Sequence, residues 1–130
     1  MNQLVGEGRW LPRNSLGEQD APTRIRIGSH LDLARLLNPT GEKGMSFIEL
    51  ADKLFLTKGK HQVLATGKAG TIYLCHPFLV HAAQPHYGTN PRFMSQPPLY
   101  PAKEFKLYRQ TGKYSPLEIA IRIGAGLDTM

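Results

Sequence analysis

Three of the five histidines of the chain fall in the segment from Cys75 to His86, among apolar neighbours. A neutral imidazole is a common metal ligand and a common general acid or base, so this segment is where chemistry is most readily placed. A histidine among apolar residues is also often a structural group whose ring nitrogens bond to the backbone. Residue types alone leave both interpretations open.

The spacing of these histidines predicts that His76 and His81 lie on opposite faces of an extended segment. On an extended segment, alternate side chains point to opposite faces. His81 therefore shares a face with Leu79, and His76 shares the other face with Phe78. The spacing predicts that at most one of the two histidines points into a given pocket.

Arg92 follows these histidines, after an Asn-Pro turn and before β-forming residues. A guanidinium inside a buried strand needs a counter-charge, because its desolvation is otherwise costly. A substrate carboxylate supplies one, since it matches the guanidinium fork with two hydrogen bonds. The alternative is an edge-strand arginine that lies in solvent or pairs with a nearby acid. The sequence keeps both interpretations.

A second constellation is the His30-x-Asp32 pair in the stretch GSHLD. On a strand, these two side chains would point the same way, as two ligands of a two-histidine, one-carboxylate iron site do. Ser29 and Asp32 also have the spacing of a helix capping box, and Leu33 continues a helical pattern. In a helix, residues i and i+2 point about 200° apart. We predict a helix start at Ser29 and keep His30 and Asp32 as less favoured metal ligands.

Short strands joined by turns are the main elements that would position these residues. Alternating or apolar β-formers predict strands at 23–27, 61–65, 71–76, 78–82 and 92–95. Helical spacing predicts helices at 31–37 and 46–56, and Ser115, Pro116 and Glu118 form a capping box for a last helix that runs to about Arg122. Residues 1–22 are predicted to be a loose lead-in with at most one short strand, and residues 23–130 one domain. The predicted fold class is mainly β with short helices, α+β.

Composition narrows the function classes. The 130 residues carry a formal charge of +6, from 16 Lys and Arg against 10 Asp and Glu. The basic residues are scattered singly, which disfavours a nucleic-acid partner and leaves a small anionic substrate, for which one or two cations suffice.

Cys75 is the single cysteine, so no internal disulfide is expected and a reducing compartment is favoured. No apolar run approaches a membrane span, so we expect a cytoplasmic protein without a membrane partner.

The segment GTIYLCHPFLVHAAQPHYGTNPRFMSQPPL resembles the carboxy-terminal part of the phytanoyl-CoA dioxygenase family. The likeness lies in the order of a Gly-led apolar strand, a His-Pro, a second histidine, an Asn-Pro turn and an arginine. The upstream stretch APTRIRIGSH is also similar to the family. The resemblance implies a partial double-stranded β-helix, a cupin-like jelly roll, with Fe(II) and 2-oxoglutarate as cofactors. It makes His81 the distal iron ligand, Arg92 the anchor of a 2-oxoglutarate carboxylate, and His76 a neighbour.

The resemblance also implies that part of the site is missing. In the family, the iron-binding His-x-Asp lies upstream of the Gly-Ser-His turn, and residues 1–22 contain no histidine. The chain therefore resembles a carboxy-terminal portion of the domain. We expect a dioxygenase-like protein that oxidises a small molecule, by hydroxylation, with a non-catalytic remnant or a small-anion binding module as alternatives. Unpaired sheet edges would favour a homodimer.

Overall fold

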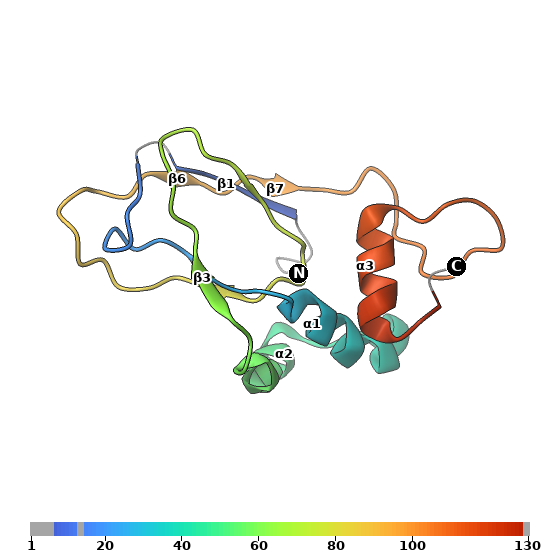
Figure 1. The fold of residues 1–130 in the computed structure, drawn as a ribbon. Helices are drawn as coiled ribbons and strands as arrows, with labels where there is room; N and C mark the ends of the chain where they lie inside the picture. Colours follow the sequence, from blue (N-terminus) through green and yellow to red (C-terminus); the bar gives the residue numbers. More distant parts are fainter. Residues whose placement is uncertain (1–6, 13–14, 129–130) are drawn as a thin grey trace.

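The computed structural model describes residues 7–12 and 15–128, and Figure 1 shows its fold. The chain is a mixture of helices and short antiparallel strands, as an α+β prediction requires. The strands are β1 (Glu7–Pro12), β2 (Arg24–Arg26), β3 (Gln62–Leu64), β4 (Tyr73–Leu74), β5 (His81–Ala82), β6 (Met94–Ser95) and β7 (Pro98–Leu99). The α-helices are α1 (Ser29–Leu37), α2 (Phe47–Lys53) and α3 (Pro116–Ala125), and 3₁₀ helices lie at Asn38–Lys43 (η1) and Leu54–Thr57 (η2).

The strands form two small antiparallel sheets. In one, β1 pairs with β4, β6 and β7, so residues inside the predicted lead-in form its central strand. In the other, the order is β3-β2-β5, with Ile25 opposite both Val63 and His81. The jelly roll implied by the family resemblance remains a prediction.

A small apolar core lies where strands of both sheets meet. Ile25 and Ala65 are its fully buried members. The side chains packed against them come from β3, β4, β6 and the segment before β5, namely Val63, Tyr73, Cys75, Leu79 and Met94. The alternation of β2 explains this placement, because Ile25 points into the core while Arg24 is exposed. Ile27, predicted to share the buried face, is exposed because β2 ends at Arg26.

Helices α1 and α3 pack closely against each other. Leu33 and Ala34 of α1 and Ile121 of α3 are buried. The approach is tight at Gly124, where a β-carbon would lie 2.7 Å from the Ala34 Cβ and 2.7 Å from the Leu31 carbonyl oxygen. A residue without a side chain is therefore required at this point of α3.

Capping explains where α3 begins. The Ser115 hydroxyl accepts a hydrogen bond from the backbone N–H of Glu118, whose carboxylate accepts one from the N–H of Ser115. This is the predicted capping box, with Pro116 in the first turn. The helix runs past Arg122 to Ala125 and ends at Gly126, whose φ of 72° is left-handed.

Other predicted elements are shorter than expected. The predicted strands at 71–76 and 78–82 are reduced to β4 and β5, and the predicted helix at 46–56 divides into α2 and η2. Strand β7 was not predicted, since it begins with a proline, which cannot donate to a strand ladder. Within the described ranges, no helix has the length and apolar character needed to cross a membrane.

Candidate functional site

His81 lies on β5, at the edge of the β3-β2-β5 sheet. Its side chain is exposed, and Nδ1 lies 2.9 Å from the carbonyl oxygen of Leu79. A carbonyl only accepts hydrogen bonds, so Nδ1 carries the hydrogen and Nε2 carries the lone pair. A backbone carbonyl that fixes the tautomer in this way is the usual arrangement behind a metal-binding histidine. In this tautomer, Nε2 is the ring nitrogen of His81 that carries the lone pair.

His76 has the opposite tautomer. Its Nδ1 accepts a hydrogen bond from the backbone N–H of Phe78 at 3.1 Å, so Nε2 carries the hydrogen. Its carbonyl oxygen accepts from the N–H of Leu79 at 3.0 Å, which closes a turn just before His81. A protonated Nε2 cannot bind a metal. His76 is thus a structural group of the turn that delivers His81.

Arg92 is half-buried beside the start of β2. Its Nη1 donates to the carbonyl oxygen of Ala21 at 2.7 Å, and its Nη2 lies 3.3 Å from the Thr23 hydroxyl and 3.4 Å from the Met94 sulfur. These partners are all neutral, and no carboxylate of the described chain forms an ion pair with Arg92. A guanidinium has five N–H groups, so at least two remain outside these contacts. In the described part of the chain, Arg92 is thus a cation held in place by neutral partners.

His81 and Arg92 border the same core. Leu79 packs against the Ile25 cluster, and His81 lies two residues later, directly opposite Ile25. Met94 packs against the same cluster, and Arg92 lies two residues before it. The two residues therefore lie at the ends of segments that meet at the core, with the His81 side chain exposed and that of Arg92 half-buried.

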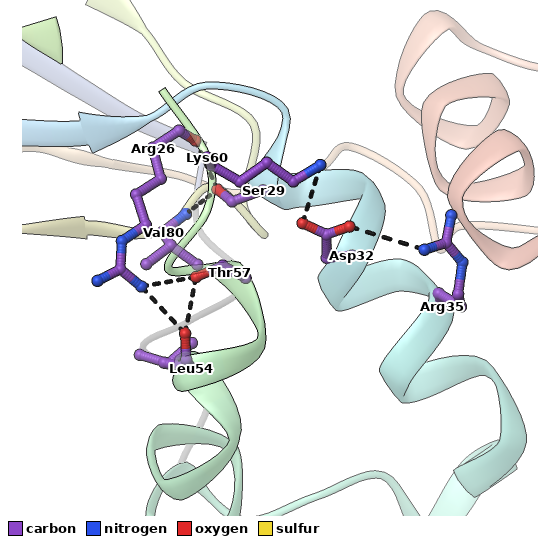
Figure 2. A network of polar contacts seen from close by, with 8 residues as sticks. All are labelled: Arg26, Ser29, Asp32, Arg35, Leu54, Thr57, Lys60 and Val80. Atoms are coloured by element: carbon purple, nitrogen blue, oxygen red, sulfur yellow. Dashed lines mark hydrogen bonds and ion pairs between the residues drawn. The ribbon is translucent and has the colours of Figure 1, made fainter. Parts of the chain in front are cut away.

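His30 and Asp32 do not join His81. Asp32 pairs with Lys60 at 3.2 Å and Arg35 at 3.7 Å on the surface of α1 (Figure 2). The His30 ring stacks obliquely on His76, with centroids 4.9 Å apart. In residues 7–12 and 15–128, no three His, Cys, Asp or Glu side chains are grouped so that they could hold a metal ion. His30 and Asp32 therefore belong to no such group of three and remain less favoured as metal ligands.

Burial sets the protonation of this region. It lowers the pKa of His30, against the opposing charge of Asp32, and it lowers the pKa of His76 to about 4, with His30 adding to the effect. Both rings are neutral at pH 7. His30 Nδ1 and His76 Nε2 are buried and have no hydrogen-bond partner among residues 7–12 and 15–128. Burial also raises the pKa of the Cys75 thiol, which disfavours the reactive thiolate form.

Ser29 is the residue of this region whose role the sequence reasoning missed. The predicted capping box was wrong although the helix start was right, because Gly28, in the left-handed conformation, is the N-cap and no side chain caps α1. The fully buried Ser29 hydroxyl donates to the Arg26 carbonyl at 2.7 Å and accepts from the Val80 N–H at 2.8 Å (Figure 2). It ties the end of β2 to the residue before His81. The sequence signal for this arrangement was Gly28, because a glycine readily adopts the left-handed conformation that the N-cap of α1 has.

Thr23 was also missed as a partner of Arg92. It is buried, its hydroxyl faces the Arg92 guanidinium, and its carbonyl oxygen accepts from the Ala65 N–H at 2.9 Å. The sequence could have indicated this role, because Thr23 lies two residues before Ile25 and so falls on the core side of β2. Comparison of the chain with protein-family models, characterised proteins and solved structures finds no match.

Proposed function

We propose that the chain is a dioxygenase-like domain that binds a 2-oxo acid, with 2-oxoglutarate as the ligand implied by the sequence resemblance. The observation that carries the proposal is Arg92, a half-buried guanidinium whose contacts among the described residues are all neutral. A carboxylate would satisfy its remaining N–H groups with charge-assisted hydrogen bonds. Because Ala21 and Thr23 fix the guanidinium in advance, little ordering is needed when a ligand arrives.

His81 is proposed as the one metal ligand that this part of the chain contributes. Its hydrogen bond to the Leu79 carbonyl suits the role, and the residues two positions from His81 and Arg92, Leu79 and Met94, pack against the same Ile25 cluster. An iron centre of this class needs two histidines and a carboxylate. The described residues do not fit that requirement, since they group no such set of three. We therefore propose that the described residues bind the oxo acid and do not by themselves turn it over.

The second candidate is a small-anion binding module without redox chemistry. It is favoured by the same Arg92 contacts and by the incomplete ligand set. The two candidates differ in ligand selectivity, because a site shaped for an oxo acid prefers 2-oxoglutarate to inorganic phosphate, whereas a general anion site does not. They also differ in whether added Fe(II) strengthens 2-oxoglutarate binding through His81.

Isothermal titration with 2-oxoglutarate and with phosphate, with and without Fe(II) under anaerobic conditions, tests the proposal. We expect 2-oxoglutarate to bind and Arg92→Gln to weaken it at least about tenfold, since a charge-assisted bidentate contact is lost. Arg35→Gln is the matched control, because Arg35 is exposed on α1. Equal affinity for both anions would favour the general anion module, and unchanged binding in Arg92→Gln would reject both candidates. Release of succinate from the unmodified chain with Fe(II) would contradict the statement that it does not turn over.

A further inference from the structure

A depression open to solvent lies on the other side of β2, between the sheet and the helices α2 and η2. Its volume is about 360 Å³, within the range of small-ligand sites. Its wall on the strand side includes Arg24 and Arg26, its helical wall includes Ala51 and Phe55, and Lys58 follows η2. We propose that this depression, called the α2 depression here, binds a small organic anion with an apolar body, such as a medium-chain carboxylate.

Charge supports an anionic ligand. Arg24, Arg26 and Lys58 line the depression against a single acid, Asp52, and none of the four forms an ion pair within the described chain. Arg24 and Arg26 are two residues apart on β2, so both point away from Ile25 and the core. Two guanidinium groups on one face offer an anion two forks of donors.

Hydrogen bonds of Arg26 hold the two walls of the depression together. Its Nη1 donates to the Leu54 carbonyl at 3.0 Å and to the Thr57 hydroxyl at 2.6 Å, and Thr57 is fully buried (Figure 2). These bonds fasten η2 to β2, so the two walls keep their spacing. The other terminal nitrogen of Arg26 points away from both partners in Figure 2.

The apolar lining of the depression indicates that the rest of the ligand is apolar. Phe55 and Ala51 are exposed on the helical wall, and Val80 and Ala82 line the depression from β5 and the residue before it. An inorganic anion would leave this surface in water, whereas an alkyl chain would cover it. His81, the proposed metal ligand, also lines the depression, but Arg92 does not, so the depression is distinct from the Arg92 contact proposed for the oxo acid.

Titration with octanoate below its micelle concentration tests the inference. We expect octanoate to bind, and Arg24→Gln with Lys58→Gln together to weaken it about tenfold, as two partly exposed ion pairs are lost. Lys68→Gln with Lys113→Gln is the matched control, because both lysines are exposed and neither lines the depression. Octyltrimethylammonium, with the same chain and the opposite charge, should bind at least about tenfold more weakly.

Three results would overturn the inference. They are equal binding of octanoate and octyltrimethylammonium, equal losses in the control and test variants, and no octanoate binding at all. Arg92→Gln should leave octanoate binding unchanged, so failure of this site and failure of the proposed oxo-acid site can be told apart. Circular dichroism of each variant checks that it is folded, and Arg24→Lys, which keeps the charge, should retain most of the affinity.

Discussion

His76 and His81 are five residues apart, yet their hydrogen bonds give them opposite tautomers. The backbone around His76 offers an N–H to its Nδ1, whereas the backbone around His81 offers a carbonyl. A ring nitrogen can bind a metal only through its lone pair, so the neighbouring backbone decides which histidine is available. The sequence could place the two histidines on opposite faces, but it could not assign their tautomers, because these depend on the turn at residues 76–79.

At Ser29 we predict that removal of the hydroxyl destabilises the protein. Ser29→Ala leaves the Val80 N–H and the Arg26 carbonyl without their buried partner, which should lower the free energy of unfolding by about 2 kcal/mol. Urea denaturation measures the change. Ser95→Ala, an exposed serine of β6, should change it by less than about 0.5 kcal/mol. Equal effects of the two substitutions would mean that the Ser29 bridge contributes nothing.

At His76 we predict a loss of stability in mild acid. The folded pKa of about 4 lies below the ordinary value of 6.5, so the unfolded chain binds a proton that the folded chain does not accept. The free energy of unfolding should therefore fall as the pH drops from about 6.5 to about 4, by about 2 kcal/mol for this half-buried group. Denaturation curves across this range measure it.

A matched pair of variants isolates this effect. His76→Asn keeps an acceptor near the Phe78 N–H and removes the titrating ring, so the slope between pH 6.5 and 4 should flatten. His86→Asn removes an exposed histidine and should leave the slope as it is. A slope that persists in His76→Asn would assign the acid sensitivity to other groups, with His30, which lies against His76 and beside Asp32 and Lys60, the first to examine.

Among the elements, the contact between α1 and α3 depends on a single glycine. A β-carbon at position 124 would lie 2.7 Å from two atoms of α1, one of them backbone, so the helices would have to separate. We predict that Gly124→Ala lowers the free energy of unfolding by about 1 to 3 kcal/mol despite the better helix propensity of alanine. Thermal or urea unfolding tests this. Ile123→Ala, at an exposed neighbour on α3, should have a small effect, and a Gly124→Ala protein as stable as the wild type would contradict the packing argument.

Sequence patterns predicted the elements that local chemistry determines. The capping box at Ser115 and Glu118 and the alternation of β2 are visible in a few adjacent residues, and both are present. The same kind of pattern failed at Ser29, because a distant backbone group, the Val80 N–H, took the hydroxyl that a cap would have used. The neutral partners of Arg92 also lie far away in the chain, at Ala21 and Thr23. Contacts of this kind are fixed by tertiary structure and are not present in any local pattern.

For the whole molecule, many large apolar side chains lie on the surface. The core cluster has two fully buried members, whereas large apolar side chains are exposed over α2, η2 and the later loops, among them Phe47, Ile48, Phe55, Leu56, Tyr87, Phe93, Tyr100 and Tyr108. Strands β3 and β5 are also the outer strands of their sheet. Exposed apolar patches and strand edges favour association with another chain.

We therefore predict self-association, with a homodimer as the first species. Sedimentation velocity over a range of protein concentrations should show a sedimentation coefficient that rises with concentration. Ile48→Lys, which places a charge on the exposed face of α2, should reduce the association if that face takes part, whereas Lys113→Gln should not change it. A monodisperse monomer at every concentration would contradict this prediction.

The central claim is that Arg92 is the contact for a ligand carboxylate. Arginine Nε–H resonances in a ¹⁵N-labelled sample report on it directly, with the Arg92 signal assigned by its loss in Arg92→Lys. On addition of 2-oxoglutarate, we predict that the Arg92 signal shifts in a saturable manner while that of the exposed Arg35 stays in place. An Arg92 signal that does not move at saturating 2-oxoglutarate, or one that moves no more than that of Arg35, would contradict the claim.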